Sequence, residues 1–231
     1  MLKLCQGWKF TSNHLSDEDG RIILIWRDPV VVTCLHQSRQ SLTCQIRIPN
    51  LPQFNYTAIY ASNLSSERTD LWIELLNISQ SLLLSSSSWM IGGDFNQILH
   101  PAEHSNVAVN TLTPKMTEFR DCLTQLGMFD LRFHGPQHTW TNNQPETPVA
   151  KKLDRLLVNS FFVADFPNST ARFLPPLTSD HTSCLIDLAH PLPKAGTRPF
   201  KFFNYLSKHP DFHPLVMEAW IQAGSFASTL S

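Results

Sequence analysis

The chain has 231 residues, of which 42% are hydrophobic and 16% charged, so it can bury one large core and is not a disordered protein. A formal net charge of −1 excludes a global basic field, and a polyanionic partner would have to be held by local groups or a bridging cation. The five cysteines are odd in number and form no Cys-x-x-Cys pair, which argues against a disulfide framework or zinc knuckle and favours a reducing, intracellular compartment.

Membrane insertion is not expected. The first residues contain no sustained apolar region of the kind a signal peptide needs, and no later stretch reaches transmembrane length. The sequence therefore predicts a soluble protein, nuclear or cytoplasmic, with no membrane partner.

The first third of the chain alternates apolar runs with short polar breaks. Two β-branched runs within residues 21–35 and a third at 41–48 predict a β-meander, and the run at 56–61 predicts a further strand. An amphipathic helix is predicted next, from the helical spacing of Leu71, Trp72, Leu75 and Leu76.

The stretch 89–96 (WMIGGDFN) is an apolar run that ends on a carboxylate and a carboxamide. Its apolar half predicts a buried strand, and the glycine pair permits a tight backbone turn. If the chain stays extended, Asp94 and Asn96 project on the same side. An Asp can accept a proton from water or bind a cation, and an Asn amide can donate hydrogen bonds to a phosphoryl oxyanion. An isolated Gly-Asp-Phe-Asn is also commonly a simple turn, so a catalytic interpretation depends on motifs later in the chain.

The second half mixes one clear helix with short extended pieces. The helix starts near Pro114 and is closed by Gly127. The extended pieces after it are at 129–133, 138–141, 153–158, 172–174 and 184–188. This mixture predicts the α/β or α+β class with mainly antiparallel strand pairing.

The composition changes from Pro191 onward. Three prolines within nine positions precede the aromatic residues of 200–205 and a predicted helix from about Pro214 to Gln222. We predict one domain over residues 1–190 and a linker with a tail helix over 191–231. The aromatic residues are either a docking stripe or part of a helix folded back on the core.

Two more polar clusters interrupt apolar strands, at 152–155 (KLDR) and 178–181 (TSDH). An adjacent Asp-His at a strand entrance can hold a metal or an oriented imidazole, and a His near neutrality can contact a phosphate or move a proton. A lone Ser-Asp-His usually marks a polar turn. Three such clusters in order, each beside a strand, predict a single site for phosphate chemistry.

These motifs resemble the endonuclease/exonuclease/phosphatase superfamily, and within it the endonuclease domain of plant LINE-type (non-LTR) retrotransposons. The resemblance runs over nearly the whole chain, through DGRIILIWRDP, AIYASN, WMIGGDFNQIL, LGMFDLRFHGPQHTWTNNQP, KKLDRLLVN, FPNSTARFLPPLTSDHTSCLIDL and RPFKFFNYLSKHPDF. It implies a DNase-I-like four-layer α/β sandwich of two mainly antiparallel sheets flanked by helices. It also implies that the tail leads toward a reverse transcriptase, which is absent here.

The resemblance implies a role for each matching residue. Asp94 would orient or deprotonate the attacking water, and Asn96 would stabilise the phosphoryl transition state. Tyr60 would point its hydroxyl at the scissile phosphate, and Asp154 would hydrogen-bond the catalytic His181. The other implied positions are Asp180 as a metal-side carboxylate and Ser179, Thr139 and Trp140 as phosphate-contacting, DNA-contacting or site-supporting residues. The implied cofactor is Mg²⁺, acting as a Lewis acid that offsets the acidity of the site, and the implied substrate is DNA.

The sequence departs from the family pattern before its first strand. The family domain opens with an Asn-bearing strand, a helix and a strand ending in Glu, the principal Mg²⁺ ligand, whereas residues 6–10 here already resemble the strand after that Glu. Glu18 and Glu67 are expected in polar loops and lack the family's flanking pattern. We therefore expect a truncated domain that lacks its first strand and helix, exposes core surface, and hydrolyses DNA weakly or not at all. The alternatives are a non-catalytic nucleic-acid-binding remnant and, less favoured, a phosphatase acting on a soluble phosphoester.

Overall fold

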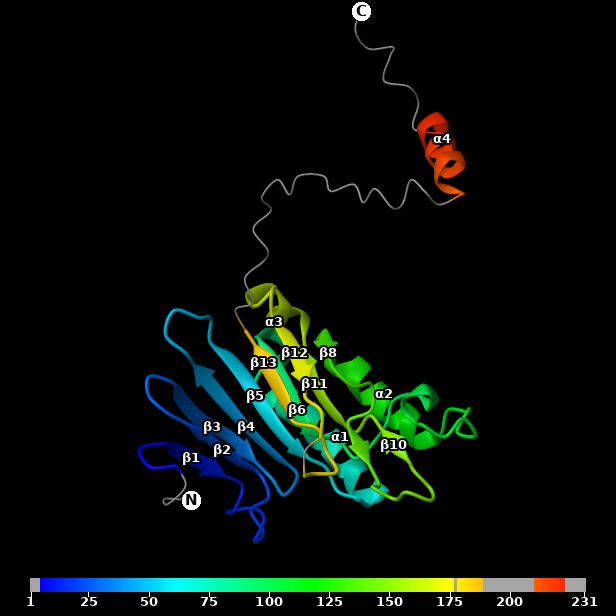
Figure 1. Ribbon diagram of the computed structural model, residues 1–231. Coiled ribbons are helices and arrows are strands. Elements are labelled where there is room, and N and C mark those ends of the chain that lie inside the picture. The colour runs from blue at the N-terminus through cyan, green and yellow to red at the C-terminus, as the bar shows by residue number, and fades with distance from the viewer. Residues whose placement is uncertain (1–4, 177, 189–209, 223–231) are drawn as a thin grey trace, which may run out of the picture. The chain divides into compact units, whose positions relative to one another are not determined.

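The structure is a computed structural model that describes residues 5–176, 178–188 and 210–222. The chain divides into two units, residues 1–190 and 191–231, and the first unit carries all the described strands (Figure 1). In the second unit the tail helix α4 spans Phe212–Gln222, beginning two residues before the predicted Pro214. The proline and aromatic run at 191–205 lies outside the described residues. No helix in the described part of the chain is long and apolar enough to span a membrane.

A six-stranded sheet forms the centre of the first unit. Its strands, in spatial order, are β3 (Val31–Gln37), β4 (Ser41–Arg47), β5 (Phe54–Tyr60), β6 (Trp89–Asp94), β11 (Asp154–Val158) and β7 (Phe129–Asp130). Only the pair of β5 and β6 is parallel in this sheet, because the helix between them returns the chain to the edge where β5 began. The predicted class, α/β with mainly antiparallel pairing, is confirmed.

Three smaller sheets complete the strand structure. They are β1 (Lys9–Ser12) with β2 (Ile23–Trp26), β13 (Cys184–Asp187) with β12 (Thr170–Phe173) and β8 (Phe133–His134), and β9 (Trp140–Thr141) with β10 (Ala150–Lys151). The predicted meander over residues 21–48 is therefore wrong in one respect, since β2 pairs with β1 and not with β3. The chain leaves one sheet for the other at Asp28-Pro29, where proline has no N–H to offer a strand ladder.

Helices α1 (Ser65–Ser81) and α2 (Pro114–Leu126) cover one face of the six-stranded sheet, as Figure 1 shows. Between them and the sheet, the rings of Trp72 and Phe119 stack with centroids 4.4 Å apart, and Phe95 lies against both. Both predicted helices are confirmed, including the left-handed cap at Gly127, whose φ is 65°. Glu67, expected in a loop, lies instead in the first turn of α1, where a negative charge is favourable.

The opposite face of the sheet carries a short helix and two of the smaller sheets, β1 with β2 and β8 with β12 and β13. Helix α3 (Ser160–Asp165), which no sequence pattern predicted, packs Phe162 against Phe54 and Met90 in a second apolar cluster. Ile91 and Leu157 belong to the first cluster, under α1 and α2. Alternate residues of the central strands thus pack into two different cores, because successive side chains of a strand point to opposite faces of the sheet.

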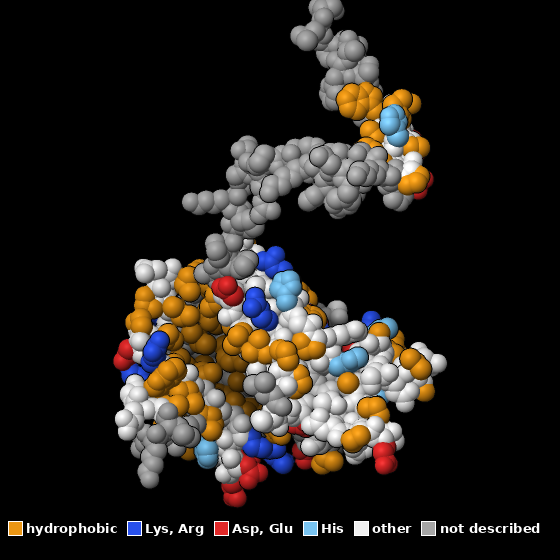
Figure 2. Space-filling view, in the orientation of Figure 1, with side chains coloured by type: hydrophobic (Ala, Val, Ile, Leu, Met, Phe, Trp, Pro, Cys, Tyr) orange, Lys and Arg blue, Asp and Glu red, His pale blue; other side chains and the backbone are white. Residues whose placement is uncertain are grey.

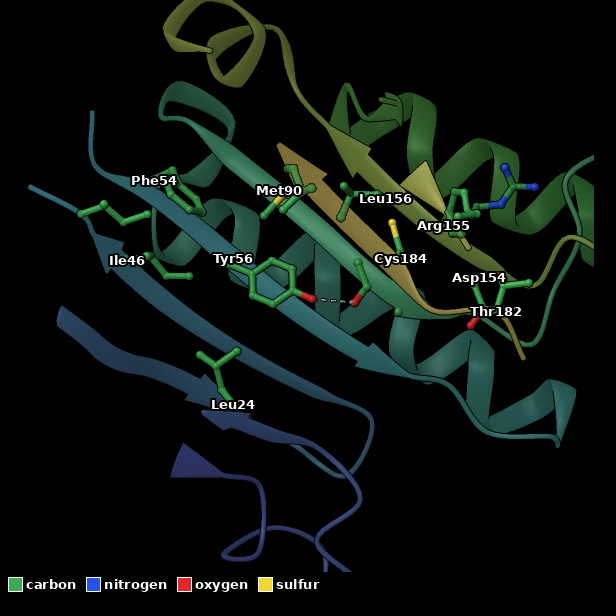
Figure 3. Close-up of a pocket in the computed structure, with 15 residues that line it drawn as sticks. Leu24, Ile46, Phe54, Tyr56, Met90, Asp154, Arg155, Leu156, Thr182 and Cys184 are labelled. Atoms are coloured by element: carbon green, nitrogen blue, oxygen red, sulfur yellow. Dashed lines mark hydrogen bonds between the residues drawn. The ribbon is translucent and has the colours of Figure 1, made fainter. Parts of the chain in front are cut away.

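An apolar groove opens on this second face, between β2 on one side and β12 and β13 on the other (Figure 3). Ile46, Tyr56 and Met90, from β4, β5 and β6, form its floor, and Leu24 and Cys184 face it from the two sides. The groove has a volume of about 430 Å³. In Figure 2 it is the hollow lined by hydrophobic side chains, so part of the core surface of this unit is open.

Gly93 in β6 allows a close approach of the backbone of β5. Its φ is 141°, and a Cβ there would lie 2.0 Å from the carbonyl oxygen of Ile59. We expect Gly93→Ala to lower the free energy of unfolding by about 3 kcal/mol or more, measured by denaturant titration, because the two strands must separate or distort.

Gly127→Ala is the matched control for that substitution. Its φ of 65° is also left-handed, yet a Cβ would meet nothing within 4 Å. The expected loss is only about 1 kcal/mol, from the backbone conformation alone. If both substitutions lowered the free energy of unfolding equally, the contact with β5 would not be the reason that position 93 requires glycine.

Candidate active site

The pairing of three strands sets the positions of three predicted site residues. Asp94, the last residue of β6, is paired with Tyr60 at the end of β5 and with Asp154 at the start of β11. Backbone hydrogen bonds extend this arrangement past the strand end, from Ala61 N–H to the Asp94 carbonyl and from Phe95 N–H to the Leu153 carbonyl. Neighbouring strands lie about 4.8 Å apart, so the register alone brings these side chains to one edge of the sheet.

Asn96 does not continue the extended strand, so the condition under which Asp94 and Asn96 would project from a common strand face is not met, although both side chains line the same pocket. Asn96 has a φ of 48°, and its N–H donates to Asp94 Oδ1 at 2.8 Å. Its Nδ2 donates to the Ala61 carbonyl at 2.8 Å. Asn tolerates the left-handed conformation and Asp accepts a bond from two residues on, so the turn begins after the strand and not at the glycine pair.

His181 completes the cluster. Its Nδ1 lies 3.0 Å from Asp154 Oδ2, and its Nε2 lies 3.9 Å from Asp94 Oδ2. The backbone N–H of His181 donates to Ser179 Oγ, so Ser179 supports the turn that presents the imidazole. Because Nδ1 is bound to a carboxylate, Nε2 is the ring nitrogen left toward Asp94 and the pocket.

The other three predicted positions lie beside this cluster. Thr139 is buried, and its Oγ1 accepts the N–H groups of Leu153 and Asp154, so its contacts hold the start of β11 in place. Trp140 Nε1 donates to Asp180 Oδ2 at 3.0 Å. That hydrogen bond is the main reason the pKa of Asp180 is lowered. Asp180 therefore orients Trp140, and it is not part of the cluster formed by Asp94, Asp154 and His181.

The cluster has perturbed acid–base properties. Burial raises the pKa of Asp94 to about 6, against the lowering effect of the hydrogen bond from Asn96, and the charge of Asp154 raises it further. The hydrogen bond to Asp154 raises the pKa of His181. A carboxyl whose pKa is raised by burial, beside an imidazole whose pKa is raised by a carboxylate, can exchange protons with a bound water or an ester oxygen.

The same three residues could hold a metal ion. One ligand atom from each of Asp94, Asp154 and His181 lies within 4.8 Å of the others. Mg²⁺ is usually bound through one or two carboxylates together with water and substrate phosphate, so the two aspartates fit this ion. The imidazole suits it less well, which leaves His181 for the phosphate or a proton.

A polar pocket of about 530 Å³ opens over the cluster. Besides predicted residues it is lined by Asn63, Arg68, Lys151 and Leu153, whose roles the sequence patterns did not reveal. Arg68 could have been found from periodicity, because it precedes Leu71 and Trp72 by three and four residues and so falls on the inward face of the helix. Lys151 and Asn63 carry no comparable signal.

Behind the pocket, a buried ion network secures the strand that bears Asp154. Arg155, fully buried, pairs with Asp130 at 2.7 Å and with Glu103, and Lys152 pairs with Asp130 at 3.1 Å. Buried charges of this kind are favourable only when they are paired, as they are here. The network fixes β11 on both sides of Asp154.

Comparison with known proteins agrees with this fold. The family model described as Endonuclease/Exonuclease/phosphatase family matches residues 2–181. The endonuclease domain of TRAS1, a telomere-specific non-LTR retrotransposon, is 12% identical with a TM-score of 0.63, covering 80% of this chain and 81% of that one. A mannosyl-6-phosphatase of Bacteroides thetaiotaomicron is 9% identical with a TM-score of 0.52, covering 80% and 78%. No curated protein sequence matches the chain.

The mainly antiparallel sheets flanked by helices define a DNase-I-like α/β fold. The chain belongs to the endonuclease/exonuclease/phosphatase family, because the family model matches well over half of its length.

Asp94 should make the stability of the protein depend on pH. Its folded pKa of about 6 lies above the ordinary 3.8, so burial of the carboxyl costs no stability below pH 3.8. The cost grows as the pH rises from 3.8 through about 6 and is constant above that, where the carboxyl is ionised in both states. We expect Asp94→Asn, which keeps the acceptor for the Asn96 N–H, to raise the free energy of unfolding at pH 8 by about 3 kcal/mol relative to its effect at pH 4. Denaturant titrations in chelator measure this, and a gain independent of pH would contradict it.

Proposed function

We propose that this chain is a Mg²⁺-dependent endonuclease domain of the plant LINE type, hydrolysing phosphodiester bonds of DNA. The observation that carries the proposal is the cluster of Asp94, Asp154 and His181. Asp94 and His181 line a polar pocket together with Asn63 and Asn96, and Asp154 holds His181 from outside the lining. Carboxylates, an oriented imidazole and amide donors around one cavity are the groups that phosphoryl transfer to water requires.

Each residue has a distinct part in the proposed hydrolysis. Asp94, buried and with a pKa near 6, accepts a proton from the attacking water at neutral pH. Asp154 holds His181 so that its Nε2 meets a phosphoryl oxygen, and the raised pKa of His181 favours the protonated imidazole that such an oxygen attracts. Asn96 Nδ2 donates one N–H to the Ala61 carbonyl, which leaves its second N–H as a donor for the same charge. Mg²⁺ held by the carboxylates would supply Lewis acidity to the phosphate.

The residues at the rim of the pocket favour DNA over a small phosphoester as the proposed substrate. Trp140 is held there by Asp180, and Lys151 Nζ lies 5.5 Å from the centre of its ring. An aromatic plane next to a cation suits a base and the adjoining phosphate of a nucleic acid strand. The fold by itself does not identify the substrate, since the similar structures include both the endonuclease domain of a non-LTR retrotransposon and a mannosyl-6-phosphatase.

We propose further that hydrolysis by this chain is weak, and that the chain represents the family fold without its Asn-bearing and Glu-bearing strands. Two observations support this. The metal-binding cluster within the described residues holds two carboxylates and no glutamate. The apolar groove between β2 and β13 leaves core surface open, as the loss of a central strand would. Loss of the principal metal ligand would cost orders of magnitude in rate.

Plasmid nicking tests the proposed function. With Mg²⁺, the purified chain should convert supercoiled plasmid to the open circle slowly, and chelator should abolish the conversion. Asp94→Ala and His181→Ala should each lower the rate by about a hundredfold or more, since each removes a group in contact with the reacting atoms. Asp121→Ala, an exposed carboxylate on α2 outside the pocket, is the control and should nick like the parent chain.

The alternatives give different results in the same assay. DNA binding that weakens with salt, without nicking by a folded chain, would favour a non-catalytic nucleic-acid-binding domain. Phosphate release from small phosphoesters without nicking would favour a phosphatase. Fast nicking that survives Asp94→Ala would contradict the assignment of this cluster as the active site.

A further inference from the structure

Arg68 is a buried cation beside the candidate active site, and the proposed hydrolysis assigns no role to it. It lies in the first turn of α1 and is 9% exposed, on the helix face that also buries Leu71 and Trp72. It also lines the polar pocket together with Asn63, Asp94 and Asn96. An arginine is rarely buried to this degree unless its charge and its donors are used.

The hydrogen bonds of Arg68 join two segments that carry site residues. Its Nη1 donates to the carbonyl oxygens of Ser62 and Asn63, both at 2.9 Å. Its Nη2 donates to Oε1 of Gln97 at 3.2 Å, and Gln97 directly follows Asn96 in the chain. The guanidinium therefore connects the end of the segment after β5 with the turn after β6. Loss of these bonds would remove a direct connection between the segment of Asn63 and the turn that carries Asn96.

The charge of Arg68 has no ion-pair partner of its own. Among the ion pairs formed within the described part of the chain, none includes Arg68. Burial lowers its pKa, while the negative charges of Asp94 and Glu118 raise it. Glu118 is already paired with Lys115, and Asp94 faces His181. A buried positive charge at the wall of a pocket, without a contacting carboxylate, favours an anion in that pocket.

We propose that Arg68 is a positioning residue that also gives the pocket its affinity for the phosphodiester anion. This inference rests on the proposed function and deepens it. The guanidinium holds the Asn63 and Asn96 segments at fixed separation, and its charge offsets that of a phosphodiester bound against Asp94 and Asp154. A purely structural role would need only the donors of Arg68, whereas this role needs its positive charge as well.

Two substitutions separate the donors from the charge. Arg68→Gln keeps an N–H donor for the carbonyl oxygens and removes the charge, and Arg68→Lys keeps the charge with fewer donors. Arg120→Gln, an exposed position on α2, makes the same change in net charge away from the pocket. The measurement is the Kd for a short fluorescently labelled DNA duplex, by anisotropy at fixed salt and in chelator so that nothing is cleaved. Thermal unfolding of each variant is recorded alongside.

We expect Arg68→Gln to weaken DNA binding about tenfold, as loss of one charge-assisted contact does, and Arg68→Lys to stay within about threefold of the parent chain. Arg120→Gln should bind like the parent. Equal binding by Arg68→Gln and the parent chain would overturn the proposal, and so would failure of the parent chain to bind the duplex. If Arg68→Gln does not fold, Arg68→Lys tests the proposal instead. A tenfold weaker binding of DNA by Arg68→Lys would overturn it, because this variant keeps the positive charge.

The outcome is separable from that of the proposed function. A chain that binds DNA through Arg68 but never nicks plasmid would leave this inference standing and remove the catalytic one. A chain that nicks plasmid with Mg²⁺ while Arg68→Gln binds and nicks normally would do the reverse.

Discussion

The close pairing of β6 with β5 on one side and β11 on the other is the constraint on which the site depends. The register of these three strands places Tyr60, Asp94 and Asp154 in a row at one edge of the sheet. Gly93 permits the close approach of β5 and β6, because a side chain at this position would clash with the backbone of β5. Gly92 does the same toward Leu156 of β11, where a Cβ would lie 2.7 Å from Cδ1. The glycine pair thus allows close strand packing, and through it the geometry of the candidate site.

The fold and the chemistry make opposite demands on charge. Burial of Asp94 raises its pKa into the range useful to a base, yet the same burial makes the ionised carboxylate unfavourable for the folded state. The buried cations around the site are of two kinds, those with an ion-pair partner and one without. Arg155 and Lys152 are paired with acidic partners behind the sheet and serve to fix β11. Arg68, without such a partner, remains available to an anion in the pocket.

The apolar groove and the polar pocket share the same central strands. Met90 of β6 contributes to the floor of the groove, and Asp94 of the same strand lines the pocket. Asp154 borders the groove, as its place in Figure 3 illustrates, and its carboxylate holds the His181 that lines the pocket. A change in how the groove is filled would therefore act on residues that also position the site.

The sequence predicted the local elements well where one physical rule dominated. Apolar periodicity located α1 and β6, and the proline and glycine at the ends of α2 marked its limits. The prediction from sequence failed where the pairing of a strand depended on residues far away in the chain. The run that became β2 looks like any meander strand, but it pairs with β1, and Leu24 on it packs over Leu42 and Cys44 of β4. Helix α3 is too short for periodicity to show.

By itself, then, the sequence determined the class of fold, the order of the motifs and the residue types that phosphate chemistry would need, because these depend on side-chain chemistry and short-range spacing. Only the tertiary structure decided which of them meet. Strand register brought Asp154 to Asp94, and the fold placed His181 on Asp154 while turning Asp180 toward Trp140. The left-handed turn at Asn96 and the buried guanidinium of Arg68 likewise depend on hydrogen bonds between segments far apart in the chain. Periodicity can place Arg68 on the inward face of its helix, but it cannot identify the partners of these hydrogen bonds, since each bond is made by a single pair of residues that the folded backbone brings together.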